Sequence, residues 1–335
     1  MAITYHAGRR IQGTDDPTLN YGTKSIDGSY TVLQFTESGI FKPTSVFNVE
    51  YLVVAGGGGA SRAGGGAGGY LTNLGGTALG VTAQSYGITV GAGGNGSLGT
   101  SANGINGSNS IFDTITSTGG GGGGKNDLAG SSGGSGGGGG ASGGGSNFAG
   151  GSSSPVTSPV QGYAGGTGGG ATNYPGGAGG GSSAVGGNAS SNTVAPSGGA
   201  GTSSSITGTS LFYAGGGGGT INSGTGGAGG SGGGGNGGIG VDGSDATGYG
   251  SGGGAGSNTL TGGDGSDGIV IIRFLTSGNT YADNLPNAQV GSRFEETDTR
   301  KMYHRDDIDF KLEDGNEATN YRSASWYEQL SGETP

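Results

Sequence analysis

Residues 46–60 have the sequence Val-Phe-Asn-Val-Glu-Tyr-Leu-Val-Val-Ala-Gly-Gly-Gly-Gly-Ala, a strand-like stretch that runs directly into glycine. Its first ten residues are rich in β-branched and aromatic side chains, which predicts a β-strand. The continuously apolar end, 51–54, indicates that both faces of this strand are covered. Residues 269–274, Ile-Val-Ile-Ile-Arg-Phe, have the same character. We expect these two strands to pair, which would bring together the two ends of the segment between them.

The segment between the two strands is dominated by glycine. The chain has 335 residues with 93 glycines, and only nine of those glycines lie outside residues 56–268. Fixing the backbone of one residue costs about 1–2 kcal/mol, and glycine has no side chain whose burial could offset this. Two alternatives remain. The segment is a flexible coil, or its main chain is ordered by hydrogen bonds between its own runs.

The ordered alternative has a physical basis. Glycine can form an extended helix with three residues per turn and a rise of about 3.1 Å, whose N–H and C=O groups point outward. Without Cβ atoms such helices can pack side by side and bond laterally. Connectors at 152–159, 173–175 and 192–196 contain four of the eight prolines and separate the glycine runs. We therefore predict an all-β protein, a β-sandwich with a large glycine-rich insertion that forms a packed polyglycine II slab, flanked by small β terminal modules.

The composition divides the chain into three parts. Residues 1–29 are expected to be an N-terminal docking segment, residues 30–278 the β-sandwich with its polyglycine II slab, and residues 279–335 a charged, aromatic β module. Alternation at 299–304 and 308–312 predicts short hairpins in the last part. About 50 residues is marginal for independent folding, so this module is expected to need a neighbouring subunit.

Several classes of function are excluded by composition. There is no Cys, so disulfides, thiolate zinc sites and cysteine nucleophiles are absent, and the two histidines, His6 and His304, make a His-based triad improbable. A net charge of −10 disfavours nucleic acid and anionic lipid as partners. No apolar run is long enough to span a membrane. The N-terminal MAITYHAGRR has no apolar core of a secretory signal, so we expect synthesis in a host cytoplasm without a signal peptide.

Three motifs suggest ligand chemistry. Gly91–Gly96 matches G-x-G-x-x-G, but residues 97–109 cannot form the helix that a dinucleotide site needs. Gly119–Lys125 approaches a phosphate-binding loop, but Asn126 replaces the required Ser or Thr. Residues 262–270 match one copy of a calcium-binding nonapeptide, which would place calcium at Asp264 and Asp267. Because that architecture needs stacked copies, we interpret the motif as a Gly/Asp turn that leads into a strand. We predict no cofactor and no metal.

Three aromatic residues in the longest connectors are candidates for receptor binding: Phe148, Tyr163 and Tyr174. Amphipathic aromatic rings often anchor recognition surfaces. The alternative is that these rings pack against the edges of the slab.

The order of motifs resembles a known family. Gly39-Ile-Phe-Lys-Pro43, residues 49–55 with the glycine run that follows, residues 88–94 and 109–112, and residues 262–274 follow the order seen in the glycine-rich domain of many phage and viral structural proteins. The slab is similar in composition to the polyglycine II sandwich of tailed-phage receptor-binding adhesins. These adhesins grip host receptors with loops at the tips of the slab.

The resemblance implies a structural virion protein, a tail fibre, spike or tip component that displays the glycine-rich domain for host-surface attachment. Its implied partners are other virion proteins, a host cell-surface protein or glycan, and further copies of itself, with a trimer as one arrangement. The alternative is a scaffold without recognition, such as a capsid decoration or an extracellular filament subunit. We predict no enzymatic activity, since the adjacent carboxylates Glu295-Glu296 and Asp306-Asp307 would face opposite ways on a strand.

Overall fold

A computed structural model describes residues 20–143, 145–156, 159–170, 172–191, 193–277 and 279 in full, together with the backbone of five terminal strands. The strands of this described part pair in antiparallel fashion, and it contains no helix, which confirms the all-β prediction. It likewise holds no helix long and apolar enough to cross a membrane.

The terminal strands form two separate small sheets. One is a hairpin and the other has the order β15-β16-β17. Their bounds are β1 (Thr4–His6), β2 (Arg9–Ile11), β15 (Arg293–Glu296), β16 (Lys301–Arg305) and β17 (Trp326–Gln329). The hairpin predicted near 299–304 corresponds to the pairing of β15 with β16, whereas the one predicted at 308–312 lies outside the described residues.

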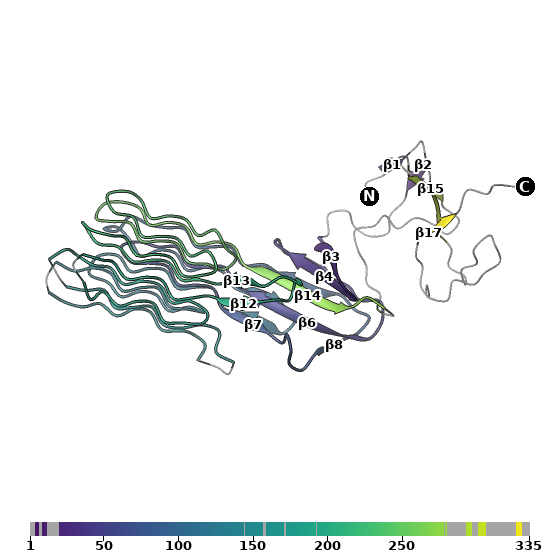
Figure 1. Ribbon diagram of the computed structural model, residues 1–335, viewed down its shortest axis with the longest axis horizontal. Coiled ribbons are helices and arrows are strands. Elements are labelled where there is room, and N and C mark those ends of the chain that lie inside the picture. The colour runs from purple at the N-terminus through teal and green to yellow at the C-terminus, as the bar shows by residue number, and fades with distance from the viewer. Residues whose placement is uncertain are drawn as a thin grey trace, which may run out of the picture.

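The strand in residues 269–274 lies at the centre of the larger sheet of a sandwich (Figure 1). The strand order of this sheet is β3-β4-β14-β6-β7. β7 pairs with the C-terminal half of β6, and β8 pairs with its N-terminal half. The bounds are β3 (Thr23–Asp27), β4 (Tyr30–Phe35), β14 (Ile269–Leu275), β6 (Phe47–Val54), β7 (Tyr70–Thr72) and β8 (Leu79–Val81). Ile271 of β14 pairs with Leu52 of β6, so the predicted pairing is confirmed. The sheet begins before residue 30, because β3 pairs with β4 along its whole length.

The second sheet packs against the first across an aromatic core. It has the order β11-β10-β9-β5, built from β5 (Gly39–Phe41), β9 (Tyr86–Thr89), β10 (Ser110–Phe112) and β11 (Ile115–Ser117). Phe41 lies at the centre of this core, with its ring centroid 6.1–6.3 Å from those of Phe47, Phe112 and Phe274. Alternate residues of the central strand, Val270, Ile272 and Phe274, complete the core.

The other face of the larger sheet is covered as well. Ile269 and Ile271 of β14 point to this side and pack with Ile206 and Tyr213 of a hairpin. The hairpin consists of β12 (Thr202–Ser204) and β13 (Leu211–Tyr213), which lie over β6 and β14 in Figure 1. Burial on both sides explains why the sequences of β6 and β14 are continuously apolar at this point.

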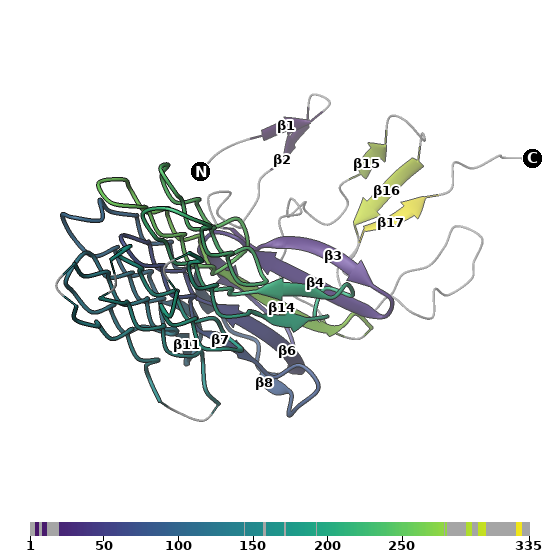
Figure 2. The same cartoon turned by 60° about the vertical axis from the view of Figure 1, so that its left-hand side comes forward.

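The glycine-rich segment between β6 and β14 forms a slab of extended runs side by side, which Figure 2 shows from a second direction. In the first run, 55–61, the direction of main-chain donation repeats every third residue. Its bonds are Gly56→Ser108, Gly59→Ile105, Gly57→Ser266, Ala60→Gly263, Gly58→Gly66 and Ser61→Ala63. A repeat of three residues with lateral bonds is the arrangement of polyglycine II.

Inner runs are surrounded on all sides. Run 63–69 donates to or accepts from six neighbouring runs, which are 55–61, 118–124, 135–141, 176–181, 214–220 and 250–256. At Gly58, Gly65 and Gly121 a Cβ would lie closer than 3.0 Å to a main-chain oxygen of the next run, and none of the three has a positive φ. These positions therefore need glycine for close approach of the runs and not for a left-handed backbone.

Candidate functional site

The turns farthest from the sandwich gather at one end of the slab, at the left of Figure 1. Run 55–61 leaves β6, turns at 61–63 and returns to β7, and the later runs repeat this path outward and back. We call the exposed face of these turns the tip surface. It is formed by residues 98, 100–102, 125–128, 143, 145–147, 172–174, 193–194, 222–225, 239–242 and 258–260, and the turn at 61–63 is buried beneath it.

A buried cation lies beneath the tip surface. Arg62 is 1% exposed, and its Nη2 donates to the main-chain oxygen of Tyr174 at 2.8 Å and to Oδ1 of Asn222 at 2.5 Å. Nε and Nη1 have no hydrogen-bond partner among the described residues. Loss of hydration lowers the pKa of Arg62 to about 10, while the nearby Tyr174 acts in the opposite direction. Arg62 thus stays charged at neutral pH and joins two loops that are far apart in sequence.

Tyr174 is held in an unusual backbone conformation. Its φ is +50°, a value that bulky residues rarely adopt. The preceding Asn173 clasps the neighbouring loop, because its Nδ2 donates to the oxygen of Ser223 at 2.5 Å and its Oδ1 accepts from the N–H of Ser223 at 3.1 Å. A Cβ at Gly143 would overlap the Tyr174 ring, so the ring packs on the main chain of a third loop. With 38% of its surface exposed, Tyr174 is presented at the tip in a fixed position.

The three aromatic candidates do not form one cluster. Phe148 lies next to the tip, where it exchanges two main-chain hydrogen bonds with Gly168, at 3.2 and 2.8 Å. Tyr163 is five residues before Gly168 on the same run, which at about 3.1 Å per residue places it about 15 Å nearer the sandwich. Tyr174 and Phe148 are thus close to the tip, whereas Tyr163 lies on the side of the slab.

Tyr163 lies close to the turns at the sandwich end of the slab, and these turns expose further apolar residues. Val156, Val160 and Val185 are 87%, 53% and 62% exposed, and Tyr163 is 40% exposed. Gly186, next to Val185, donates to the oxygen of Ala164, next to Tyr163. We call these four residues the shoulder patch.

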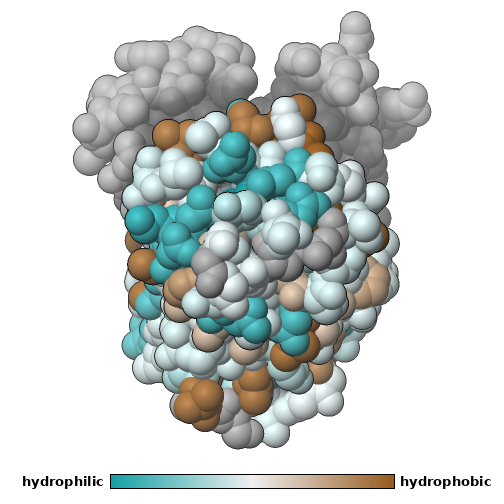
Figure 3. All heavy atoms as spheres, turned by 90° about the vertical axis from the view of Figure 1, so that its left-hand side faces the viewer, coloured by the Kyte–Doolittle hydropathy of each residue, from teal (hydrophilic) through white to brown (hydrophobic). Residues whose placement is uncertain are grey.

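The tip surface itself is mostly polar and uncharged. Figure 3 looks onto it, and hydrophobic residues lie in separate places among hydrophilic and neutral ones. Leu98, Leu128, Val194 and Val241 are each 44–61% exposed, and each belongs to a different loop. Asn, Ser, Thr and Gly supply most of the remaining surface.

The aspartates considered for calcium have a structural role. Oδ1 of Asp264 accepts from the N–H of Gly96 at 2.6 Å, and Oδ1 of Asp267 accepts from Gly93 at 2.8 Å. No group of three or more His, Cys, Asp or Glu side chains that could hold a metal occurs within the described residues. The same bonds place residues 91–96, the G-x-G-x-x-G match, in a slab run, and no helix follows it.

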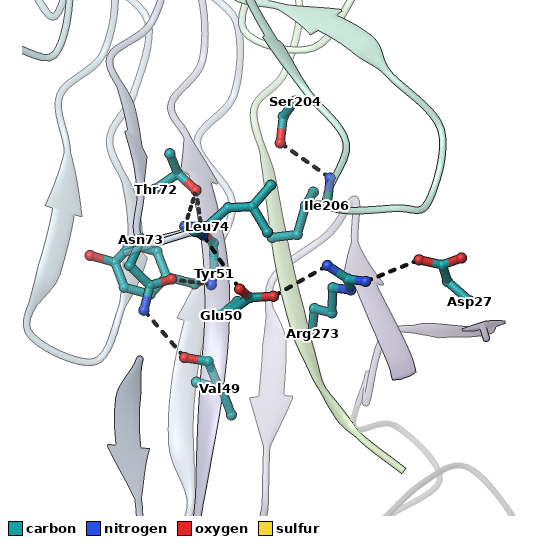
Figure 4. A network of polar contacts seen from close by, with 11 residues as sticks. Asp27, Val49, Glu50, Tyr51, Thr72, Asn73, Leu74, Ser204, Ile206 and Arg273 are labelled. Carbon is teal, nitrogen blue, oxygen red and sulfur yellow. Dashed lines mark hydrogen bonds and ion pairs between the residues drawn. The ribbon is translucent and has the colours of Figure 1, made fainter. Parts of the chain in front are cut away.

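A second polar cluster lies on the larger sheet under the β12–β13 hairpin (Figure 4). Arg273 forms ion pairs with Asp27 at 3.1 Å and with Glu50 at 3.3 Å, and its guanidinium lies 3.8 Å from the centroid of the Tyr30 ring. These residues come from β14, β3, β6 and β4. The cluster braces four strands and presents no nucleophile.

Sequence reasoning did not identify Arg62. The available signal was that Arg62 and Lys125 are the only basic residues in 56–268, a segment otherwise rich in glycine. A charged residue isolated in such a segment is expected either to be solvated or to satisfy buried main-chain acceptors, and only the fold decides between these.

Comparison with protein families gives one match. A family model described as a glycine-rich domain matches residues 36–275. No curated protein matches the chain. The matched residues comprise the whole slab, including the tip surface, and the strands of the sandwich other than β3 and β4.

Proposed function

The chain belongs to the glycine-rich domain family, and from this premise we propose that it is a structural virion protein that displays the tip surface for attachment to a host. In this proposal the chain is a tail fibre, spike or tip component without catalytic activity. The slab carries the tip loops, and the terminal parts dock the chain to the particle or to further copies of itself.

The observation that carries the proposal is that the tip loops are separate from the hydrogen-bonded runs that support them. Every tip loop connects two runs whose main chains are bonded to neighbouring runs, so the ends of each loop are fixed. Loops on such a rigid support can differ in sequence without disturbing the fold, which is the usual design of recognition proteins. The tip loops lie at the end of the slab that is farthest from the sandwich. β14 ends at Leu275, on the edge of the sandwich that faces away from the slab (Figure 1).

The chemistry of the tip surface supports recognition. Tyr, Ser, Gly and Asn dominate antibody binding loops, because Tyr supplies rigid contact area and the small polar residues supply adaptable hydrogen bonds. The loop 172–175 contains Thr172, Asn173 and Tyr174, and the loop it clasps contains Asn222 and Ser223. Tyr174, fixed by Arg62 and half exposed, is the residue that we assign as the anchor.

The scaffold alternative rests on a different observation. The shoulder patch consists of four exposed apolar residues in or beside the turns at the sandwich end of the slab, which are Val156, Val160, Tyr163 and Val185. Grouped apolar residues of this kind commonly mark protein–protein contacts. In a scaffold this patch would contact other subunits, and the tip surface would be buried in the assembly or bind nothing.

Labelling of virus particles tests the proposal. An antibody raised against the full chain is applied to particles purified from the culture that produces it, and the particles are imaged by electron microscopy. We expect label on outward projections. Absence of the chain from purified particles would overturn the virion assignment, and label restricted to a continuous shell would favour the scaffold alternative.

A further inference from the structure

Some runs of the slab have a set of main-chain donors that no main-chain oxygen of a neighbouring run accepts. Run 118–124 donates to two runs: Gly120 and Gly123 bond to the first run, and Gly121 and Gly124 bond to run 135–141. The remaining donors recur every third residue and face away from both. An inner run such as 63–69 uses all three directions.

Asparagine side chains occupy this third direction. Oδ1 of Asn109, Asn106 and Asn103 accepts from the N–H of Gly119, Gly122 and Lys125 at 2.9, 2.8 and 2.9 Å. The three asparagines are spaced by three residues because one turn of the run takes three residues. We call Asn103, Asn106 and Asn109 the asparagine ladder.

Aspartate side chains accept main-chain hydrogen bonds in the same way elsewhere on the slab. Asp264 and Asp267 accept from Gly96 and Gly93, at 2.6 and 2.8 Å. Asp242 accepts from Thr261 at 2.9 Å, and Asp245 accepts from Asp264 at 2.8 Å. Four of the six aspartates of the segment are thus used to accept main-chain donors of an adjacent run.

We propose that the asparagine ladder prevents a second copy of the chain from pairing with this face of the slab. Without the side chains, the N–H groups of Gly119, Gly122 and Lys125 would form an open row, equivalent to the edge of a β-sheet, and such edges recruit further chains. The carbonyls on an outer run of a second slab recur every three residues, with the same spacing as these donors, so a second slab is the partner that fits. Pairing would continue the lattice that already joins run 118–124 to its neighbours.

The proposal does not depend on host attachment, and the test measures self-association. The full chain carrying N103A, N106A and N109A is compared with wild type by sedimentation over a range of concentrations. We expect the mass of the variant in sedimentation to increase with concentration and to reach at least twice the mass of wild type. The matched control is N95A, which removes an exposed asparagine of run 91–97 outside the ladder, and it should sediment as wild type does.

A crosslink locates the contact. The chain has no cysteine, so S108C places one exposed thiol on the run that carries the ladder, a third of a turn away from the three asparagines. A short bismaleimide should link two copies in the ladder variant and not in the ladder-intact chain. S231C, on run 225–231 and away from the ladder, should not be linked in either background.

Two results would overturn the proposal. One is a folded triple variant that keeps the wild-type mass at every concentration. The other is crosslinking through S108C in the ladder-intact chain. If the triple variant does not fold, the single variant N106A with S108C is measured in the same way. Absence of a crosslink in that protein would also overturn the proposal.

Discussion

Arg62 and Tyr174 are joined by a hydrogen bond of 2.8 Å from the guanidinium to the main-chain oxygen, across 112 positions of sequence. The bond connects the first turn of the slab to the loop that presents an exposed ring. Since Arg62 is buried and Tyr174 has a φ of +50°, each residue depends on the other for its environment.

Removal of the Arg62 side chain should weaken the tip. R62A leaves Asn222 Oδ1 and the Tyr174 oxygen without their donor and opens a cavity, so we expect the free energy of unfolding to fall by about 3 kcal/mol. R62M should cost less, because it fills the space and removes the cost of burying a charge. Chemical denaturation of the three proteins measures both effects. An R62A variant as stable as wild type would contradict the role given to this residue.

A methyl group inside the slab should be far more costly than one on a strand. A Cβ at Gly122 would lie closer than 3.0 Å to the oxygen of Gly104, whereas a Cβ at Gly87 in β9 would have no atom within 4 Å. We expect G122A to destabilise the chain by about 3 kcal/mol, since backbone must move. The matched G87A should change stability by less than about 1 kcal/mol.

Thermal melts followed by circular dichroism rank the two glycine variants. If G122A has the same melting temperature as G87A, the close approach of the runs is not the reason that position 122 requires glycine.

Tyr213 should contribute a loss of stability at high pH. Burial raises the pKa of Tyr213 to about 12 from a usual value of 10.0. Between these values the unfolded tyrosine loses its proton while the folded one keeps it, so the unfolded state binds fewer protons and the free energy of unfolding decreases as pH rises. The loss reaches about 2 kcal/mol by pH 12. Y213F should lack this component of the pH dependence.

The difference between wild type and Y213F isolates this effect in urea titrations from pH 9 to pH 12. The pKa of Arg62, lowered to about 10, acts with the opposite sign in the same range but is common to both proteins. Parallel pH profiles for wild type and Y213F would show that Tyr213 does not control this range.

The aspartates at 264 and 267 should stabilise the slab without calcium. D264A removes the acceptor of the Gly96 N–H and should cost about 1 kcal/mol, whereas D264N keeps an oxygen acceptor and should cost less. Calcium at millimolar concentration should leave the melting temperature of wild type unchanged. A calcium-dependent rise in melting temperature that D264N abolishes would restore the metal interpretation.

Attachment should depend on Tyr174 more than on Tyr163. If the tip surface binds the host, Y174A should weaken binding of the full chain to host cells by about tenfold or more, as loss of an aromatic anchor does. F148A should have a smaller effect and Y163A none, because Tyr163 lies about 15 Å from the level of Phe148 along the run. Flow cytometry with fluorescent protein measures all three. Loss of binding in Y163A alone would move the site to the shoulder patch.

Much of the fold follows from local sequence. The alternation and apolar character of residues 46–55 and 269–274 are enough to predict two strands buried on both faces, and the structure pairs them at Ile271 and Leu52. By contrast β3 was not predicted, because Thr23–Asp27 is short, mostly exposed and carries two charged residues. Its strand character comes from pairing with β4 at the edge of the sheet.

Less of the candidate site than of the fold could be predicted from the sequence. Tyr174, Phe148 and Tyr163 were chosen as aromatic residues in long connectors, and sequence could not tell which connectors turn at the tip and which at the shoulder. The asparagine ladder has a sequence signal, Asn at 103, 106 and 109, but its meaning depends on a three-residue turn and on which run lies outermost.

The sequence by itself determined that the glycine-rich segment is bracketed by two pairing strands and divided into runs, because strand propensity and turn chemistry are local properties. Only the tertiary structure decided which runs are inner and which are outer, where Arg62 lies and which turns share the tip surface. These depend on lateral hydrogen bonds between runs that consist mostly of glycine and are similar in local sequence, and glycine has no side chain to specify its neighbour.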